Sequence, residues 1–343
     1  MPDDLVLIWS VPVAIAWLVG GATAVALAGT RLSRVIDRLA DRTGLGEALA
    51  GMVLLGAATS LAGLVVSLVA AAQGEASLAV SNSLGGIAVQ TTFIVIADAT
   101  YRRANLEHAA ASLTNVFTSV LMIVLLAVVL LGAAAPPVTV LGIHPATVLL
   151  IATYGYGLYL SRKATTAPMW QPERTGATRE DVPQPAPGGE RTSRLWLQFA
   201  GLAVIVATAG YVVANSGVNL SEQTGLSGTT VGAFLTAVAT SLPELVTTLA
   251  AVRLGALTLA VAGIVGGNTF DALFVAAADV AYREGSIYAA ISQADLFVLG
   301  WTMLIVGTLT AGLLQRERKG IGFEGVAVLV LYAAGIAVVP MVG

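Results

Sequence analysis

The chain has 343 residues, of which 57% are hydrophobic and 11% are charged, and its net charge is −3. Soluble domains carry roughly 25% charged residues, so this composition excludes an ordinary soluble domain and predicts a protein that crosses a membrane several times. Cysteine is absent and the two histidines, His108 and His144, lie far apart in the sequence. Thiolate metal sites are therefore excluded, and an imidazole-based transition-metal site is disfavoured.

Ten apolar segments have about the length of 20 residues that crosses a bilayer. In chain order they fall at about 5–29, 46–72, 77–98, 111–133, 136–161, 195–216, 226–252, 257–280, 294–314 and 322–342. The first is long enough for a permanent span and lacks the pattern of a cleavable signal peptide. We therefore expect an all-α polytopic membrane protein with ten transmembrane helices.

The basic residues indicate how these spans are oriented. Sixteen of the 17 lysines and arginines follow spans 1, 3, 5, 7 and 9, and only Arg283 lies on the other side. The positive-inside rule makes the base-rich side cytoplasmic, so both termini are expected outside. The composition is rich in Arg, Ala and Val and poor in Lys, which favours a prokaryotic plasma membrane as the location.

Residues 162–194 divide the spans into two groups of five. This segment carries five prolines, charges of both signs and the pair Gly188-Gly189. Such a composition is typical of a flexible linker and not of a folded domain. We expect residues 1–161 and 195–343 to form two five-helix repeats joined by a cytoplasmic linker, 162–194.

The second half of the chain repeats the first, with an ungapped shift of 181 residues. Residues 44–103 and 225–284, the two α-repeats, share 23 identities in 60 positions. Because each half has an odd number of spans, the two halves must cross the membrane in opposite directions. Secondary transporters with such inverted repeats place their ion site at the midplane between the repeats.

Motifs within these repeats resemble those of the cation/calcium antiporter superfamily, the group of sodium/calcium exchangers. The family pattern is Gly-Thr-Ser-Leu-Pro-Glu, then Gly-Asn-x-x-Gly-Ser-Asn with Asn or Asp three residues beyond. The second repeat follows it at Thr240–Glu244 and Gly266–Asp271, and the first at Thr59–Leu61 and at Gly85-Gly86. The resemblance implies a ten-helix antiporter in which spans 1 and 6 slide across a core of the other eight.

The first repeat departs from the family pattern. Gly63 stands where the family has a glutamate, and Gln90 stands at the position that matches Asp271. Asn82 keeps the earlier motif asparagine in the first repeat, and Asn268 keeps the last one in the second. We therefore expect fewer charges than in family members with a glutamate in both repeats.

Carboxylates inside apolar segments are costly without a partner, so intramembrane acids are functional candidates. Glu244 and Asp271 are the acids nearest the middle of the repeat helices, and Pro243 removes a helix hydrogen bond beside Glu244. Na⁺ and Ca²⁺ bind carboxylate, amide and hydroxyl oxygens. The expected ion ligands are Glu244 and Asp271, as the metal-binding carboxylates, with Gln90, Thr240, Ser241, Thr59 and Ser60. The residues expected to support them or break the helices are Pro243, Asn268, Asn82, Gly63, Gly85, Gly86, Gly266 and Gly267.

Each of these residues also has a structural interpretation. The acids can be paired with a hydroxyl or an amide, and the hydroxyls can bond to their own helix backbone. The asparagines can cap or pack broken helices, and the glycines can serve close helix packing.

These residues and the resemblance to the exchanger family together imply a secondary antiporter in which Ca²⁺ and Na⁺ compete for the two acids. Two carboxylates are neutralised by one Ca²⁺, two Na⁺ or two protons, so we expect few ions to be exchanged per cycle. The alternatives are a Ca²⁺/H⁺ or Na⁺/H⁺ exchanger, or a cation-binding sensor of the same fold that transports nothing. We expect no enzyme activity, cofactor or nucleic-acid partner, and the absence of a phosphate-binding motif disfavours ATP drive.

Overall fold

The computed structural model describes residues 9–43, 59–101, 104–110, 112–166, 173–176, 178, 192–315 and 321–342. Residues 46–58 of the second predicted span and most of the 162–194 linker lie outside this part of the chain. The described residues are almost entirely helical, with one isolated bridge between Val140 and Ile143. The helices are α1 Val11–Thr43, α4 Leu61–Ala72, α5 Ala76–Thr100, α6 Leu106–Ala109, α7 Leu113–Ala134, α8 Pro145–Thr166, α9 Thr192–Thr224, α10 Gly228–Thr230, η3 Val231–Thr236, α11 Ala237–Thr240, α12 Leu242–Leu254, α13 Leu257–Asp271, α14 Leu273–Ala281, α15 Gln293–Gln315 and α16 Phe323–Val342.

These helices follow the predicted spans in number and order. In the described part of the chain, seven helices are long and apolar enough to cross a membrane, and the bent run from α10 to α12 makes an eighth. α4 and α8 occupy the positions of the two remaining predicted spans. The prediction of an all-α protein with ten spans is thus confirmed.

Some predicted boundaries differ from the helices. α1 continues past 29 to Thr43, and α9 continues past 216 to Thr224. The sequence predicts a fifth span from about 136, whereas α8 begins at Pro145. The segment before it forms a tight turn, in which Leu141 and Gly142 have positive φ angles of 55° and 80° and the backbone amides of Val140 and Ile143 donate to each other's carbonyl oxygens. This turn uses the backbone groups that a helix would need, so the helix starts after it.

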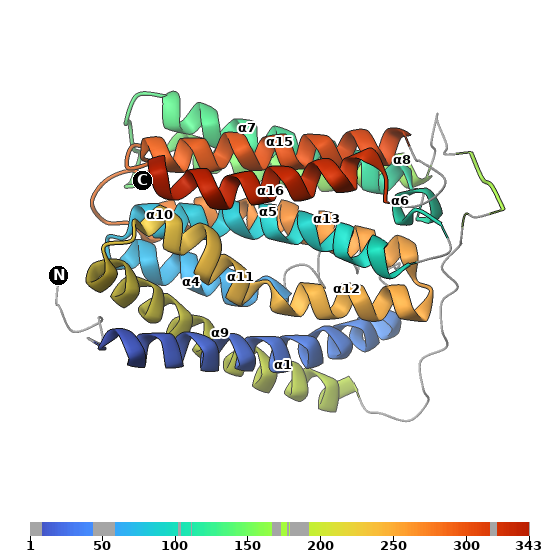
Figure 1. The fold of residues 1–343 in the computed structure, drawn as a ribbon, viewed down its shortest axis with the longest axis horizontal. Helices are drawn as coiled ribbons and strands as arrows, with labels where there is room; N and C mark the ends of the chain where they lie inside the picture. The colour runs from blue at the N-terminus through green and yellow to red at the C-terminus, as the bar shows by residue number, and fades with distance from the viewer. Residues whose placement is uncertain are drawn as a thin grey trace.

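The helices form two groups on either side of a central pair. α1 and α9 have 33 residues each and pack against each other along one side of the molecule (Figure 1). α7, α15 and α16 lie on the opposite side, with α5 and α13 between the groups. α1 begins and α16 ends at one end of the molecule, whereas α8 ends and α9 begins at the other, which we call the linker end. Each half therefore crosses the molecule an odd number of times, as inverted repeats require.

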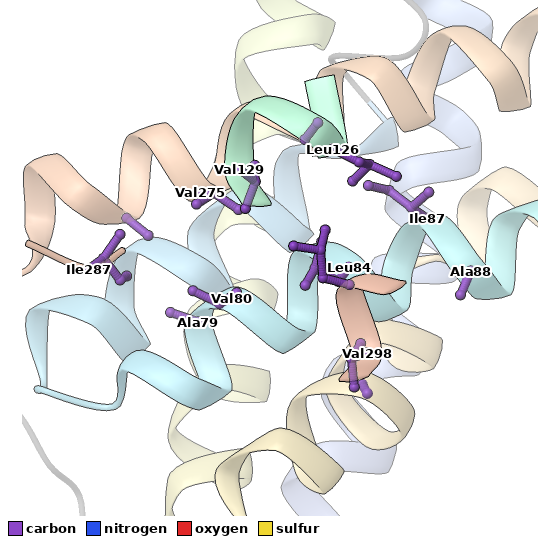
Figure 2. Close-up of a cluster of buried hydrophobic side chains, with 14 of the residues drawn as sticks. Ala79, Val80, Leu84, Ile87, Ala88, Leu126, Val129, Val275, Ile287 and Val298 are labelled. Carbon is purple, nitrogen blue, oxygen red and sulfur yellow. The ribbon is translucent and has the colours of Figure 1, made fainter. Parts of the chain in front are cut away.

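α5 is the centre of the fold. In its most apolar stretch 94% of the residues are buried, against 22% for α1 and for α16. Figure 2 shows Leu84 and Ile87 of α5 among Leu126 and Val129 of α7 and Val275 of α14. A helix that is apolar on all sides must be surrounded by other helices or by lipid. Polar residues on α5 are therefore held away from lipid, inside the protein.

The chain breaks at the second Thr-Ser-Leu motif. The helices before and after Ser241 bend by 44°, and Ser241 itself has φ −90° and ψ 2°. Pro243 follows in the first turn of α12, where the amide that proline lacks would have no partner within the helix. Upstream, Val231–Thr236 is a π-helix, a form that occurs frequently at functional sites. The break places Glu244, in the same first turn, inside the protein, where it is 3% exposed.

The inverted repeat is also visible in hydrogen bonds. Leu106 N donates to Asp98 Oδ1 at 2.6 Å, and Ile287 N donates to Asp279 Oδ1 at 3.1 Å. The two pairs occupy matching positions in the repeats, and each acid accepts the amide eight residues further along. The matching sequences of the two repeats thus form the same hydrogen bond at opposite ends of the molecule.

Candidate cation-binding site

Both repeats bring polar side chains to one small cavity. Glu244 lies in the first turn of α12, Asp271 ends α13, Gln90 lies on α5, and Ser60 precedes α4. The cavity has a free volume of about 10 Å³, which is close to that needed by one water molecule. Its lining residues are Ser60, Gly63, Asn82, Gly86, Gln90, Thr240, Ser241, Glu244, Asp271 and Phe274.

The two acids of this cavity have neutral neighbours. Gln90 Nε2 donates to Asp271 Oδ2 at 2.7 Å and to Ser241 Oγ at 3.2 Å. Ser60 Oγ donates to Glu244 Oε1 at 3.5 Å and also lies within reach of Asp271. These five residues are at most 3% exposed. The lining residues include no Lys, Arg or His, so no basic side chain lines the cavity to balance the two carboxylates.

Four oxygen atoms at or near this site have no hydrogen-bond donor among the described residues. Glu244 Oε2, Asp271 Oδ1 and Gln90 Oε1 belong to lining residues, and Asn268 Oδ1 lies on α13 three residues before Asp271, outside the lining. A buried polar atom without a partner costs about 1–3 kcal/mol. All four atoms are acceptors, so the arrangement suits a cation or protons and not an anion.

An aromatic ring occupies the space opposite the missing glutamate of the first repeat. Gly63 is the counterpart of Glu244, and a Cβ atom added there would lie 2.9 Å from Phe274 Cε2 and 3.6 Å from Thr240 Oγ1. Phe274 also lines the cavity. A longer side chain at position 63 therefore has no room unless the ring moves, and the site is left with two carboxylates.

The two motif asparagines serve different purposes. Asn82 Nδ2 donates to Gly63 O at 3.1 Å, and Asn82 Oδ1 accepts from Thr236 Oγ1 at 2.8 Å. These bonds tie α4 and η3 to α5, which fits the supporting role expected for Asn82. Asn268 Nδ2 donates to Thr91 Oγ1 at 3.0 Å, whereas its oxygen is one of the four unpaired atoms.

The two motif threonines lie at the edge of the site. Thr240 Oγ1 donates to the backbone oxygen of Thr236 at 2.9 Å, which is the structural alternative foreseen for these hydroxyls, although Thr240 also lines the cavity. Thr59 lies beside the Glu244 carboxyl. Thr59 therefore contacts one acid of the site directly, whereas the hydrogen bonds of Thr240 go to the helix backbone.

The paired glycines allow the two repeats to approach each other. A Cβ atom at Gly85 would lie 2.4 Å from Ala233 O, and one at Gly86 would lie 3.5 Å from Asp271 Oδ2. Gly266 and Gly267 are buried in α13. Small residues at such positions let helix backbones come close together.

Two hydroxyl groups that were not predicted from the sequence, those of Ser83 and Thr91, hydrogen-bond to α13 close to the site. Ser83 Oγ donates to the backbone oxygen of Asp271 at 2.7 Å, and Thr91 accepts from Asn268. Both belong to polar runs, Ser81–Ser83 and Gln90–Thr92, that interrupt an otherwise apolar segment. Those interruptions are the sequence signal that could have identified them.

A second, larger cavity leads from the linker end to Glu244. It has a volume of about 300 Å³ and runs between α12 and α13, with part of α1 on its wall. Thr30 and Arg34 of α1, Leu254 of α12 and Leu259 of α13 line it, together with Glu244 and Thr59 at its inner end. An ion entering from the linker end would therefore reach the Glu244 carboxyl first.

Asp279 and Asp295 are buried and hydrogen-bonded away from this site, whereas Glu107 and Glu324 each keep one carboxylate oxygen without a partner among the described residues. Asp279 Oδ2 accepts from His144 N at 2.8 Å and from Thr147 Oγ1 at 2.7 Å, and Asp295 Oδ1 accepts from Thr229 Oγ1 at 2.7 Å. Among the described residues, no group of three or more His, Cys, Asp or Glu is placed to hold a metal ion. Any metal at Glu244 and Asp271 must therefore rely on neutral oxygens for its remaining ligands.

The chain matches one protein family by sequence, and its fold resembles that of solved structures. The family model described as sodium/calcium exchanger protein matches residues 13–162 and 194–340. The inner membrane protein YrbG of Escherichia coli strain K12 is 29% identical over 320 residues, which cover 92% of this chain and 93% of that protein.

Two solved structures share the architecture. The sodium-calcium exchanger NCX_Mj, soaked with Na⁺ and Sr²⁺, matches with a TM-score of 0.59 and 16% identity, covering 96% of this chain and 99% of that one. The H⁺/Ca²⁺ exchanger CAX matches with a TM-score of 0.66 and 13% identity, covering 96% of this chain and 85% of that one. At these identities the likeness shows the fold alone, so the ions must be argued from the site.

Proposed function

The chain belongs to the sodium/calcium exchanger protein family, and on that premise we propose that it is a secondary-active antiporter that exchanges Ca²⁺ for Na⁺ by alternating access. Both ions bind in turn at Glu244 and Asp271, and their competition couples the two fluxes. Residues 1–161 and 195–343 act as the two inverted repeats around this site.

The ligand chemistry supports a hard cation. Ca²⁺ takes 6 to 8 oxygen ligands, and carboxylate, amide and hydroxyl oxygens are all suitable. Glu244, Asp271 and Gln90 supply oxygens that have no other partner, and Ser60 and Ser241 add hydroxyls from the two repeats. The small cavity leaves room for an ion that has shed most of its water.

The access cavity supports a state open to one side. The cavity from the linker end reaches Glu244, and sixteen of the chain's 17 basic residues lie in the segments predicted at that end. We place the linker end in the cytoplasm by the positive-inside rule. The structure then corresponds to an inward-open state, with both termini outside.

One observation carries the proposal. The unpaired buried oxygens of Glu244, Asp271 and Gln90 belong to residues that line one cavity of ion size, and no basic side chain lines it. A purely structural pair of acids would be expected to have donors for these atoms, because an unpaired buried acceptor destabilises the fold.

A flux assay tests the proposal. Purified protein in liposomes loaded with Na⁺ should take up Ca²⁺ when the external solution lacks Na⁺, and Glu244→Gln should abolish this uptake. Glu222→Gln, which makes the same change at an exposed position on α9, is the matched control and should transport normally. Normal uptake by Glu244→Gln would show that the site is wrong.

Ca²⁺/H⁺ exchange is the second candidate, and one observation favours it. The two carboxyls line one cavity that has no basic residue in its lining, so two protons balance the site as well as two Na⁺. The same liposomes distinguish the candidates, because uptake driven only by a pH gradient supports proton coupling. Ca²⁺ binding without any flux would indicate a sensor.

A further inference from the structure

A basic groove lies between α1 and α9 at the linker end, on the outer surface of the helix pair. It has a volume of about 480 Å³. Its lining residues are Arg31, Arg34, Val35, Arg38, Gln198, Gly201, Leu202 and Ile205. The three arginines are spaced three and four residues apart, so they project from the same face of α1.

The groove lies where the apolar part of the helix pair ends. The apolar segment of α1 spans Val11–Leu32, so the arginines begin at its last turn. Trp196, on the neighbouring turns of α9, is 53% exposed, and exposed tryptophans are typical of the membrane–water interface. The groove is therefore expected at the depth of the lipid headgroups.

Its chemistry combines positive charge with an apolar floor. Residues 31–42 hold four arginines and two aspartates, a net charge of +2. Arginine binds phosphate through paired N–H donors, and Val35, Leu202 and Ile205 offer apolar surface beside these guanidinium groups. A free phosphate ion would use only the first feature, whereas a phospholipid would use both.

We propose that this groove binds the headgroup of an anionic phospholipid, and that the bound lipid promotes cation entry to the transport site. The second part rests on the proposed exchange function; the first does not. The link between them is Arg34, which lines both the groove and the access cavity that leads to Glu244.

The charge of Arg34 explains how a bound lipid would affect cation entry into the access cavity. A positive side chain on the wall of a cation pathway lowers the local cation concentration, because clefts lined by one sign of charge repel that sign. A lipid phosphate that pairs with Arg34 cancels this charge. Anionic lipid is therefore expected to improve access to Glu244 without touching the site.

Binding is tested on the full-length protein in neutral detergent. Phosphatidylglycerol should raise the melting temperature of the wild type, and Arg31→Gln should lose most of that shift. Arg253→Gln is the matched control, since Arg253 is exposed at the linker-end terminus of α12 and lines neither cavity. Equal shifts in Arg31→Gln and Arg253→Gln, or the same shift from inorganic phosphate at equal concentration, would overturn the proposal.

Transport tests the second part. In liposomes of phosphatidylcholine, adding about a third of phosphatidylglycerol should lower the half-saturating Ca²⁺ concentration on the linker side by roughly threefold or more. Arg34→Gln should already show the lower value in pure phosphatidylcholine and respond little to the anionic lipid. Arg253→Gln corrects for the general surface potential, which acts on every variant.

The outcomes separate this inference from the proposed function. If no variant shows flux while phosphatidylglycerol still stabilises the wild type and not Arg31→Gln, the lipid site stands and the exchange function fails. If flux is normal but Arg34→Gln and Arg253→Gln respond equally to the lipid, the role of Arg34 is refuted.

Discussion

Gln90 Nε2 lies 2.7 Å from Asp271 Oδ2, and the two residues are counterparts in the inverted repeat, 181 positions apart. The amide of one repeat thus holds the carboxylate of the other at the point where the halves meet. In a fully symmetric chain this would be a pair of like residues. Here the neutral partner donates the hydrogen bond that two carboxylates could not make.

Gln90→Glu, which keeps the length of the side chain, is expected to make folding depend on the cation. Two carboxylates at hydrogen-bond distance repel each other, and the uncompensated buried charge should cost on the order of 3 kcal/mol in the absence of ions. Ca²⁺ would be bound by three acids and should restore the loss. The measurement is the melting temperature in chelator and in Ca²⁺. A variant that melts like the wild type in chelator would contradict the expected repulsion.

A glutamate at position 63, where the family has one, is expected to destabilise the protein unless Phe274 is also replaced by a smaller residue. Gly63→Glu places a side chain 2.9 Å from Phe274 Cε2 even at its Cβ atom, and overpacking of this kind typically costs about 1–3 kcal/mol. The double variant Gly63→Glu/Phe274→Ala should recover expression and thermal stability. If Gly63→Glu alone is as stable as the wild type, the ring does not limit the site.

Gly85 is expected to tolerate no side chain. In Gly85→Ala the new Cβ atom would lie 2.4 Å from Ala233 O, and a backbone oxygen cannot swing aside, so the repeats must separate and transport should fall. Gly300→Ala is the control, because a Cβ atom there meets nothing within 4 Å. That change should leave transport intact and raise stability by about 0.5–1 kcal/mol. Equal effects of the two substitutions on melting temperature would contradict the close approach.

Exchange is expected to be electroneutral. A site with two carboxylates is balanced by one Ca²⁺ or by two monovalent cations, so no net charge crosses the membrane per cycle. If one charge did cross, a potential of 100 mV would change the limiting Ca²⁺ ratio roughly 50-fold, since it is worth about 2.3 kcal/mol. Uptake from the same Na⁺ gradient at clamped potentials of zero and 100 mV measures this, and strongly potential-dependent uptake would refute it.

Stability is expected to fall as the pH rises above 5. Glu107 of α6 lies between the spans, and burial, with the nearby charge of Asp98, raises the pKa of its carboxyl from 4.5 to about 8. Between these values the folded state holds a proton that the unfolded state has lost. The stabilisation is therefore complete below pH 4.5 and is lost as the pH approaches 8, by up to about 1.4 kcal/mol per pH unit.

Glu107→Gln should weaken this pH dependence. The variant keeps a neutral side chain at position 107 at every pH, so its melting temperature should decline less between pH 5 and 8 than that of the wild type. Glu222→Gln, at an exposed position, serves as the control and should follow the wild type. Parallel curves for Glu107→Gln and the wild type would show that Glu107 is ionised in the folded protein.

Much of the fold can be predicted from the sequence because its signals are local. Each span is an apolar stretch of bilayer length, and the ungapped match of Thr59–Leu61 to Thr240–Leu242 reveals the repeat without any structure. The fifth span is an exception: the segment from 136 is apolar enough for a span, but a tight turn at Leu141 and Gly142 delays α8 to Pro145. Hydropathy alone does not report where the backbone turns.

The ten spans, the two repeats and the candidate acids Glu244 and Asp271 can be predicted from the order of the amino acids, because apolar length and internal identity can be counted along the chain. The contacts of these acids follow only from the assembled helices. That Gln90 holds Asp271, that Phe274 covers Gly63, and that Arg34 faces two cavities all depend on how helices pack across each other. Contacts between helices far apart in the chain leave no periodic pattern, so they become visible only when the helices are assembled.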